Sequence, residues 1–260
     1  YVKNILNLRP LEKVGIESEN RLYGTIVHKI FDYFMKKHFS FKKTEDKNTS
    51  EFLKLTEKIL SEENLSDSQR LLWSPRIQRI GKKYINYNLK NKENIKQIFT
   101  EIKGQLKLRL HSNDLAINGK ADRVDVLGNG ILKIVDYKTG SIPSNNKIKD
   151  GYEPQLPLLA IMAGNKGFKG ISLTENSHSS IELEYWKMDG KKDGFDCIPK
   201  KIDNLEEYFQ SFKFFINDFI FEDKPYFYQI EKKLNGKYDT SKHLSRIDEW
   251  IHNLKMETET

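Results

Sequence analysis

Apolar residues recur at the spacing of a helix in some segments and at the spacing of a strand in others, which predicts a mixed α/β fold. In the middle of the chain, Leu106, Leu108 and Leu110 alternate with charged or amide side chains, which is typical of a half-buried strand. The turn-prone residues 111–114 precede the next apolar run, and a Gly-rich turn at 128–130 leads into a further strand. We therefore expect three antiparallel strands in a meander.

The turn between the second and third of these strands decides which residues face each other. A two-residue loop at Asn129-Gly130 would be the usual type I′ turn, and it would place Asp122 opposite Tyr137. Asp122 and Asp136 would then point to opposite faces of the sheet, because side chains alternate along a strand. For the two acids to meet, we predict an odd-length loop or a bulge between Gly128 and Gly130.

Helical patterns flank the strands. Apolar residues recur at helical spacing over 23–34, and a helix is also predicted over 152–162, with its prolines confined to the first turn. A strand is expected at 180–187, and a helical segment from Leu205 onward. The polar stretches that we expect to be loops are 144–150 and 189–196.

The third strand ends in Asp136-Tyr137-Lys138, whose alternation places an acid and an amine on one face. If Asp122 meets Asp136, the two carboxylates repel, so the arrangement favours a divalent cation between them. Mg²⁺ prefers oxygen ligands and suits two Asp side chains better than Zn²⁺ does. Lys138 would then orient or help deprotonate the attacking water in phosphodiester hydrolysis. A solvated surface hairpin would explain the same residues, because so short a motif has low specificity.

Two further polar residues border apolar helix faces. Gln155 shares a face with Leu158, Leu159 and Met162, where an amide either binds helix-end backbone or points into a site. His28 lies beside the apolar stripe of its helix, as either a boundary residue or a metal ligand.

Four elements together resemble the RecB-like branch of the PD-(D/E)xK nuclease superfamily. They are G-x-x-x-H at 24–28, G-x-x-D-R-x-D at 119–125, V-D-Y-K-T-G at 135–140 and Q-L at 155–156. The similarity is closer still to the C-terminal nuclease domain of AddB subunits in AddAB-type helicase–nucleases. It extends to residues 1–10, 184–186 and 238–250.

This resemblance implies a restriction-endonuclease-like α/β (α+β) core, with a mixed sheet flanked by helices. We expect a single nuclease domain over 1–260, comprising a helical N-terminal part at about 1–97, a catalytic core at about 98–190 and a C-terminal helical part at about 191–260. Because the sequence begins at Tyr1 without an initiator Met, we also expect it to be a piece of a longer protein.

The resemblance also implies roles for the site residues. The metal ligands, for Mg²⁺ with Mn²⁺ as an alternative, would be His28, Asp122, Asp136 and the main-chain carbonyl of Tyr137. Lys138 would be the catalytic lysine, and Gln155 the amide that positions it or the substrate backbone. Glu101 matches a further acidic position of the family only loosely.

The implied activity is hydrolysis of single-stranded DNA during double-strand break repair, in complex with an AddA-like helicase–nuclease subunit. Two alternatives stay open. One is a catalytically silent nuclease fold that guides DNA or bridges subunits, and the other is a stand-alone RecB-like exonuclease.

The chain departs from its relatives at two positions. Many RecB-like nucleases carry a Tyr four residues after the Gln, where this chain has Leu159. Some relatives join the ends of the domain with a four-Cys iron–sulfur cluster. Cys197 is the only cysteine here, which excludes such a cluster within this chain as well as an internal disulfide, and we expect its thiol to be unreactive.

Composition agrees with a nucleic-acid enzyme. The net charge of +7 arises from Lys-rich segments and favours a polyanionic partner. No apolar run approaches the roughly 20 residues that span a bilayer, and no signal peptide is visible, so a cytoplasmic enzyme is expected.

Two expectations concern packing. Arg123 faces away from Asp122 on its strand and is predicted to be structural, paired with Asp125 or a neighbouring helix. The aromatic residues predicted to pack into the core from the C-terminal helix are Phe212, Phe214, Phe215, Phe219 and Phe221.

Overall fold

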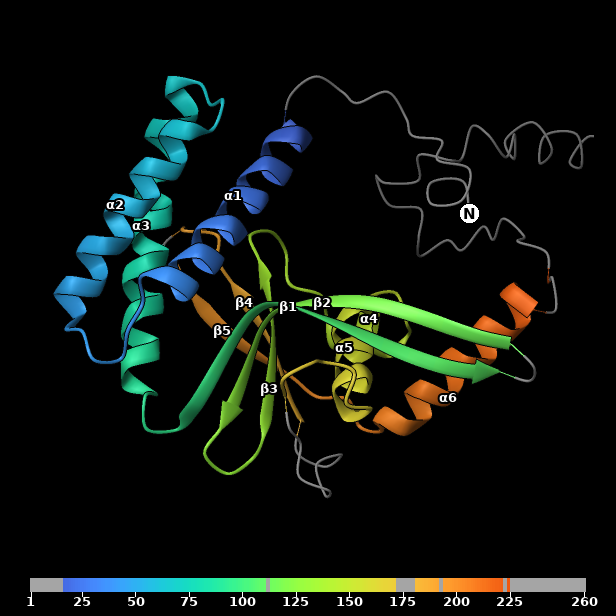
Figure 1. The fold of residues 1–260 in the computed structure, drawn as a ribbon. Coiled ribbons are helices and arrows are strands. Elements are labelled where there is room, and N and C mark those ends of the chain that lie inside the picture. The colour runs from blue at the N-terminus through green and yellow to red at the C-terminus, as the bar shows by residue number, and fades with distance from the viewer. Residues whose placement is uncertain (1–15, 111–112, 172–180, 192–193, 222–223, 225–260) are drawn as a thin grey trace, which may run out of the picture. The chain divides into compact units, whose positions relative to one another are not determined.

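A computed structural model describes residues 16–110, 113–171, 181–191, 194–221 and 224 (Figure 1). The chain divides into two compact units, of which residues 16–213 form one, while 1–15 and 214–260 form the other. The segments 1–10 and 238–250 that carried part of the family resemblance lie outside the described residues.

The described elements confirm the mixed α/β fold class. The N-terminal half contains α1 (Ile16–Lys37), α2 (Glu45–Glu62), α3 (Asp67–Lys90), β1 (Ile95–Leu110), β2 (Asn113–Leu127) and β3 (Leu132–Lys138). The remainder contains α4 (Asn145–Lys149), α5 (Gln155–Gly164), β4 (Ile181–Lys187), β5 (Asp196–Lys200), α6 (Leu205–Ile216) and the π-helical turn η2 (Asn217–Phe221). The five strands form one sheet in the order β1-β2-β3-β4-β5. The predicted antiparallel meander is β1-β2-β3, whereas β4 runs parallel to β3 and β5 antiparallel to β4.

Helices α1 to α3 cover one face of the sheet through a largely aromatic core. The sheet contributes Val135, Tyr137 and Trp186 to this core. The side chains from α1 recur at the helical spacing of the sequence pattern, and they are Tyr23, Ile26, Val27, Ile30, Phe31 and Phe34. All six are buried, so this stripe fixes which face of α1 turns toward the sheet.

Helix α5 packs against the sheet where two glycines lie opposite each other in β1 and β2. A Cβ at Gly104 would lie 2.5 Å from the sulfur of Met162, and one at Gly119 would lie 2.9 Å from the terminal methyl carbon of the same side chain. Glycine therefore allows the close approach of α5. The prolines of α5 are Pro154 at the N-cap and Pro157 in the first turn, as predicted.

The loop between β2 and β3 has the odd length that the two acids require. Leu127 N–H donates to the carbonyl of Ile131 at 2.9 Å, which leaves a three-residue loop at 128–130, and Gly130 adopts φ +84°. Val124 pairs with Ile134 instead of Val135, and the same register carried forward places Asp122 opposite Asp136. The prediction of an odd-length loop is confirmed.

Arg123 is buried on the helical side of the sheet, as predicted. Its guanidinium donates to both carboxylate oxygens of Asp125 at 2.7 and 2.8 Å, and also to Tyr84 and Asn88 of α3 at 2.9 and 2.7 Å. The ring of Trp186 lies 4.5 Å from the guanidinium carbon. Arg123 thus ties β2 to α3 from a fully buried position.

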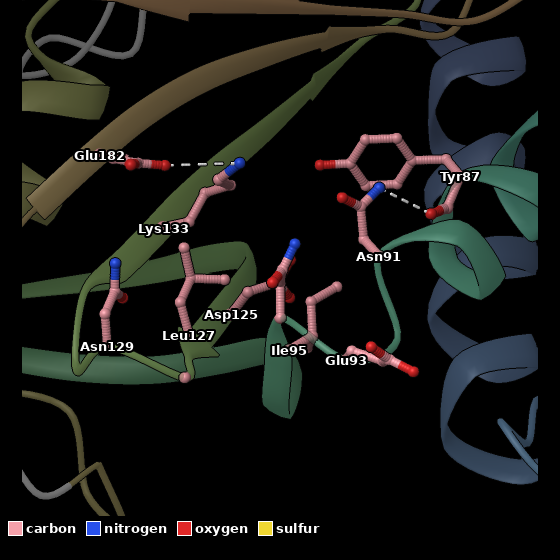
Figure 2. Close-up of a pocket in the computed structure, with 11 residues that line it drawn as sticks. Tyr87, Asn91, Glu93, Ile95, Asp125, Leu127, Asn129, Lys133 and Glu182 are labelled. Carbon is pink, nitrogen blue, oxygen red and sulfur yellow. Dashed lines mark hydrogen bonds and ion pairs between the residues drawn. The ribbon is translucent and has the colours of Figure 1, made fainter.

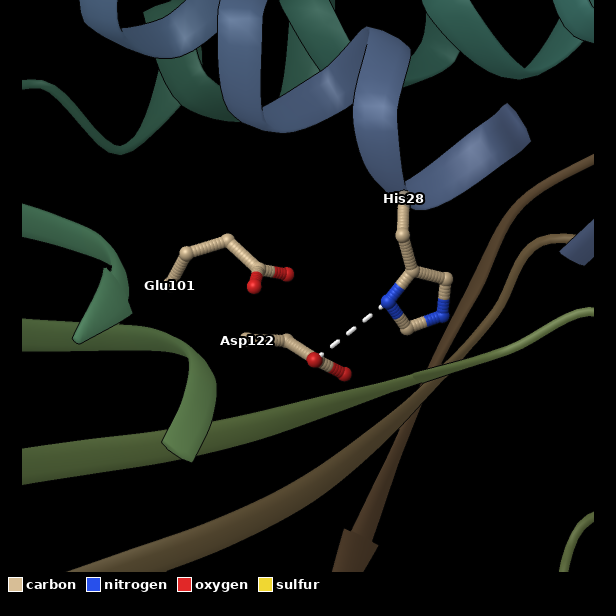
Figure 3. Close-up of side chains that lie close together, drawn as sticks. All are labelled: His28, Glu101 and Asp122. Atoms are coloured by element: carbon tan, nitrogen blue, oxygen red, sulfur yellow. Dashed lines mark ion pairs between the residues drawn. The ribbon is translucent and has the colours of Figure 1, made fainter. Parts of the chain in front are cut away.

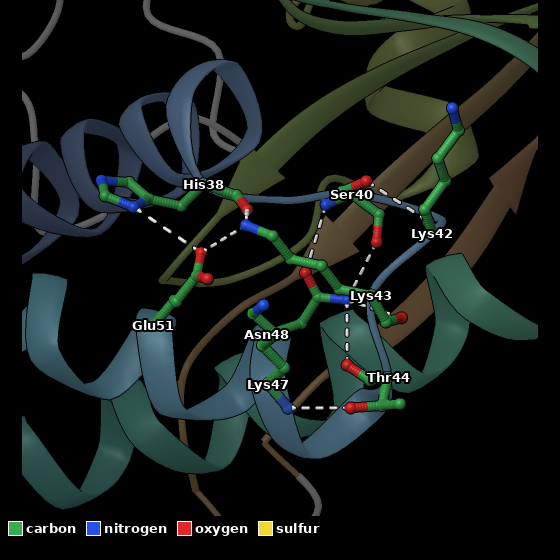
Figure 4. Close-up of polar contacts among 8 residues, drawn as sticks. All are labelled: His38, Ser40, Lys42, Lys43, Thr44, Lys47, Asn48 and Glu51. Atoms are coloured by element: carbon green, nitrogen blue, oxygen red, sulfur yellow. Dashed lines mark hydrogen bonds and ion pairs between the residues drawn. The ribbon is translucent and has the colours of Figure 1, made fainter.

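The turn between α1 and α2 is held by one buried amide (Figure 4). Asn48 donates to the carbonyl of Ser40 at 3.0 Å, and its own amide oxygen accepts from the N–H of Ser40 at 3.1 Å. Lys43 binds Glu51 at 2.6 Å beside it. These contacts fix the angle at which α2 leaves α1.

Three local predictions are corrected. The stretch 144–150 contains α4, a five-residue helix capped by Ser144 and too short to show a helical period. The strand β5 lies at the end of the expected loop 189–196 and within the region expected to be helical. Phe214 and Phe215 are 71% and 58% exposed, because Phe209 and Ile216 form the buried stripe of α6.

None of the helices in the described part of the chain combines the length and the apolar character that a membrane-spanning helix needs.

Candidate metal centre

Helix α1 approaches the end of β3 closely, and this contact brings His28 to the sheet. A Cβ at Gly24 would lie 3.1 Å from the hydroxyl oxygen of Thr139, tighter than most carbon contacts. His28 follows one turn later, beside the buried stripe of α1. The spacing G-x-x-x-H therefore has a packing reason. Gly24 allows α1 to approach the end of β3, and His28, one turn later, is thereby brought within contact distance of the sheet.

Three acids form a row across three neighbouring strands. On the β1 side, the pairs Thr100 with Arg123 and Ile102 with Ala121 place Glu101 opposite Asp122. On the β3 side, the register places Asp136 opposite Asp122. Opposed residues in antiparallel strands project from the same face, so the row concentrates negative charge at one level of the sheet.

His28 contacts two strands through its two ring nitrogens, and Figure 3 shows the contact with Asp122. Nδ1 lies 3.3 Å from Oδ1 of Asp122, and Nε2 lies 3.1 Å from the carbonyl oxygen of Tyr137. The other oxygen of Asp122 accepts a hydrogen bond from Tyr137 N–H at 2.7 Å. Imidazole, carboxylate and main-chain carbonyl therefore converge at the end of β3.

Glu101 completes this group, although sequence reasoning left its role open. One ligand atom each from His28, Glu101 and Asp122 lies within 4.8 Å of the others. Glu101 also has φ +50°, a left-handed conformation that is unfavourable for a non-glycine residue in a strand. Its carboxylate is ion-paired with Lys120. Glu101 could have been found from the register of β1 against β2, in which Leu110 pairs with Asn113.

Asp136 forms a second group with the lysine and the amide of the motif. Its Oδ2 lies 2.8 Å from Nζ of Lys138, and the same ammonium donates to Oε1 of Gln155 at 3.3 Å. Gln155 therefore reaches Lys138 from the first turn of α5. The main chain of Tyr137 joins the two groups, since it contacts both His28 and Asp122.

Burial and mutual repulsion control the protonation of this site. Burial, followed by the charge of Asp122, raises the pKa of Asp136 to about 6. Burial lowers the pKa of His28, but the hydrogen bond and charge of Asp122 outweigh it, and the net pKa is raised. A divalent cation would offset the repulsion between the carboxylates of Asp122 and Asp136, and its own charge would oppose protonation of His28.

The donor set fits such a cation. Asp136 is only 2% exposed, and its Oδ2 has the Lys138 ammonium at 2.8 Å but no partner with hydrogen-bond geometry among the described residues. Adjacent ligands of one Mg²⁺ ion lie about 3 Å apart, given bonds of about 2.1 Å in octahedral geometry. His28 Nε2 and the Tyr137 carbonyl oxygen lie 3.1 Å apart in a direct hydrogen-bond contact, and two ligands of one cation would keep the same spacing.

A pocket of about 520 Å³ opens over the first group. Its lining combines the acids and His28 with basic and polar side chains, namely Arg21, Lys29, Lys120, Asn20, Thr25 and Thr139. A second pocket, of about 500 Å³, lies where the β2–β3 turn meets the end of α3 (Figure 2). Lys133 lines this second pocket and pairs with Glu182 at 3.4 Å and with Glu184 at 2.8 Å. Its ammonium charge is therefore already neutralised by carboxylates of the protein.

The aromatic and thiol groups near the sheet have distinct environments. Tyr185 pairs with Asp136 across β3 and β4, and burial raises the pKa of its phenol, with Asp136 as the next cause. Burial raises the pKa of Cys197 to about 12, which is consistent with an unreactive thiol. Leu159, which stands where many relatives carry Tyr, is buried in the α5 interface.

The sequence of this chain matches one family along nearly its whole length. The model of the PD-(D/E)XK nuclease superfamily matches residues 1–259. An uncharacterized protein of Rickettsia felis is 30% identical over 188 residues, which cover 71% of this chain and 22% of the relative. An ATP-dependent helicase/deoxyribonuclease subunit of Streptococcus pyogenes serotype M1 is 26% identical over 157 residues, 60% of this chain and 14% of that relative. The chain thus spans between a seventh and about a fifth of the length of these relatives.

Proposed function

Because this chain belongs to the PD-(D/E)XK nuclease superfamily, we propose that it is a Mg²⁺-dependent deoxyribonuclease that hydrolyses phosphodiester bonds of single-stranded DNA. The observation that carries the proposal is the pairing of an acid cluster with Lys138 at the end of β3. Asp136 contacts Lys138, and the main chain of Tyr137 joins both to His28 and Asp122.

The proposed ligands come from three elements. They are His28 of α1, Asp122 of β2, and Asp136 with the carbonyl of Tyr137 from β3, and Glu101 of β1 adds a fifth candidate. Mn²⁺ would fit the same oxygen and imidazole donors. When bound, the cation would lower the pKa of a water and stabilise charge on the scissile phosphate.

The protein's own groups then divide the remaining work. Lys138 is held between Asp136 and Gln155, which keeps its ammonium beside the acids, where the nucleophile and the phosphate would lie. Arg21, Lys29 and Lys120 line the pocket, and basic side chains suit a phosphate backbone, although Lys29 is paired with Glu63 and Lys120 with Glu101 in the metal-free protein. This mixture of acids and bases supports a polyanionic substrate.

Similarity to one subunit of an ATP-dependent helicase/deoxyribonuclease supports a role in double-strand break repair. In this proposal the chain acts in the cytoplasm as the nuclease part of an AddB-like subunit, and an AddA-like partner delivers the single strand. Cleavage is exonucleolytic, because the strand arrives by its end.

End-labelled single-stranded DNA with Mg²⁺ tests the proposal. Wild-type protein, alone and with its AddA-like partner, should shorten the DNA, whereas Asp136→Asn and Lys138→Met should be at least about 100-fold slower. Lys147→Met on α4 is the matched control, because Lys147 is exposed and lines neither pocket, and it should cut like wild type.

Equal cutting by wild type and both site variants would refute the assignment of the site. Wild-type protein that binds the strand but never cuts it, even with the partner, would favour the silent scaffold.

A further inference from the structure

Tyr185 carries a buried hydroxyl that the fold does not use. The residue is fully buried, and its hydroxyl has no hydrogen-bond partner among the described residues. A buried hydroxyl without a partner is unfavourable for stability, and phenylalanine would fill the same volume without that cost. The hydrogen-bonding capacity of such a hydroxyl remains for a group that the described residues do not supply.

Tyr185 lies next to the groups of the proposed nuclease site. Tyr185 lies directly beside Asp136 in the parallel β3–β4 pair, so its side chain shares the face of Asp136 and Lys138. The Lys138 ammonium lies 5.5 Å from the centroid of the Tyr185 ring, within the range of a cation–π contact. The ring is thus a third contact of this ammonium, after Asp136 and Gln155.

We propose that Tyr185 is a positioning residue of the nuclease site, whose ring fixes the Lys138 ammonium and whose hydroxyl donates to an oxygen that enters with the occupied site. This inference rests on the proposed function. The incoming oxygen belongs either to a water in the site or to the phosphate of the bound strand, and both accept a hydrogen bond from a neutral phenol.

Two substitutions at this position separate the ring from the hydroxyl. Tyr185→Phe keeps the ring and removes only the hydroxyl, and Tyr185→Leu removes both. We expect Tyr185→Phe to lower kcat about 10-fold and Tyr185→Leu to lower it further. If the phosphate is the acceptor, Tyr185→Phe also weakens binding of single-stranded DNA in Ca²⁺, whereas a water acceptor leaves that affinity unchanged.

Tyr23 provides the matched control for the hydroxyl. It is also buried with an unpartnered hydroxyl, but its ring packs on Trp73 in the helical core. Tyr23→Phe and Tyr185→Phe should therefore both raise the melting temperature of the metal-free protein, while only Tyr185→Phe slows cleavage. A wild-type kcat for Tyr185→Phe would overturn the role of the hydroxyl.

The ring contact has a readout that does not need cleavage. The ¹⁵N signal of the Lys138 ammonium should report restricted motion in wild type and in Tyr185→Phe, and free motion in Tyr185→Leu. Lys200→Met, which removes a second ammonium 5.9 Å from the same ring, should leave the Lys138 signal unchanged. Free motion of the Lys138 ammonium in wild type would overturn the proposal. Restricted motion of this ammonium in a protein that cuts no DNA would mean that the proposed function fails while the ring contact holds.

Discussion

Asp136→Asn should stabilise the metal-free protein while it removes activity. Asp136 is 2% exposed, and its pKa is raised from 3.8 to about 6, first by burial and then by Asp122. The fold thus favours the neutral acid over the carboxylate. A neutral amide at this position should relieve that penalty.

The size of the effect follows from the shift. Because the pKa in the folded state lies above the unfolded value, the penalty is fully present above about pH 6 and disappears as the pH falls toward 3.8. A shift from 3.8 to about 6 corresponds to about 3 kcal/mol of unfolding free energy at pH 7. At pH 4 the expected gain from Asp136→Asn is below about 1 kcal/mol.

Chemical denaturation in EDTA from pH 4 to pH 8 measures this difference directly. Saturating Mn²⁺ should reverse the order at neutral pH, because the cation stabilises only the protein that binds it. Asp125→Asn is the matched control, since that buried carboxylate holds Arg123 at 2.7 and 2.8 Å, and its loss should destabilise the fold. A metal-free Asp136→Asn protein less stable than wild type at pH 7, or a gain independent of pH, would refute the reasoning.

Three further outcomes follow from individual contacts. Lys138→Met should lower kcat by about 100-fold or more with little change in DNA affinity in Ca²⁺, measured by single-turnover cleavage and fluorescence anisotropy; a change in affinity alone would contradict its placement. Glu101→Gln should weaken Mn²⁺ binding by about 10-fold in calorimetry, and unchanged affinity would exclude Glu101 as a ligand. Arg123→Met should lower the free energy of unfolding, measured in denaturant, by about 3–5 kcal/mol, because Asp125 would be left buried without its partner. A cost below about 1 kcal/mol would contradict the buried network.

The sequence predicted those parts of the site that depend on alternation and loop length. The shared face of Asp136 and Lys138 follows from the period of a strand, and an odd-length loop or a bulge after Asp122 follows from the need for Asp122 to face Asp136. The packing of Arg123 was likewise predictable, because it must point away from Asp122. These features are local, so few residues determine them.

The features that escaped prediction depend on distant contacts. Glu101 joins the acids only through the register of β1 against β2, which one residue of slip would reverse. Phe214 and Phe215 belong to an aromatic helix whose buried stripe could not be chosen from composition alone. The place of Tyr185 beside Asp136 depends on β4 joining β3 in parallel, a pairing that no local pattern specifies.

The central claim is that one cation binds at the end of β3, and anomalous diffraction from crystals soaked in Mn²⁺ tests it most directly. We predict a peak in contact with the proposed ligands His28, Asp122, Asp136 and the carbonyl oxygen of Tyr137, which disappears in His28→Ala crystals. A peak elsewhere, or none at saturating Mn²⁺, would contradict the account.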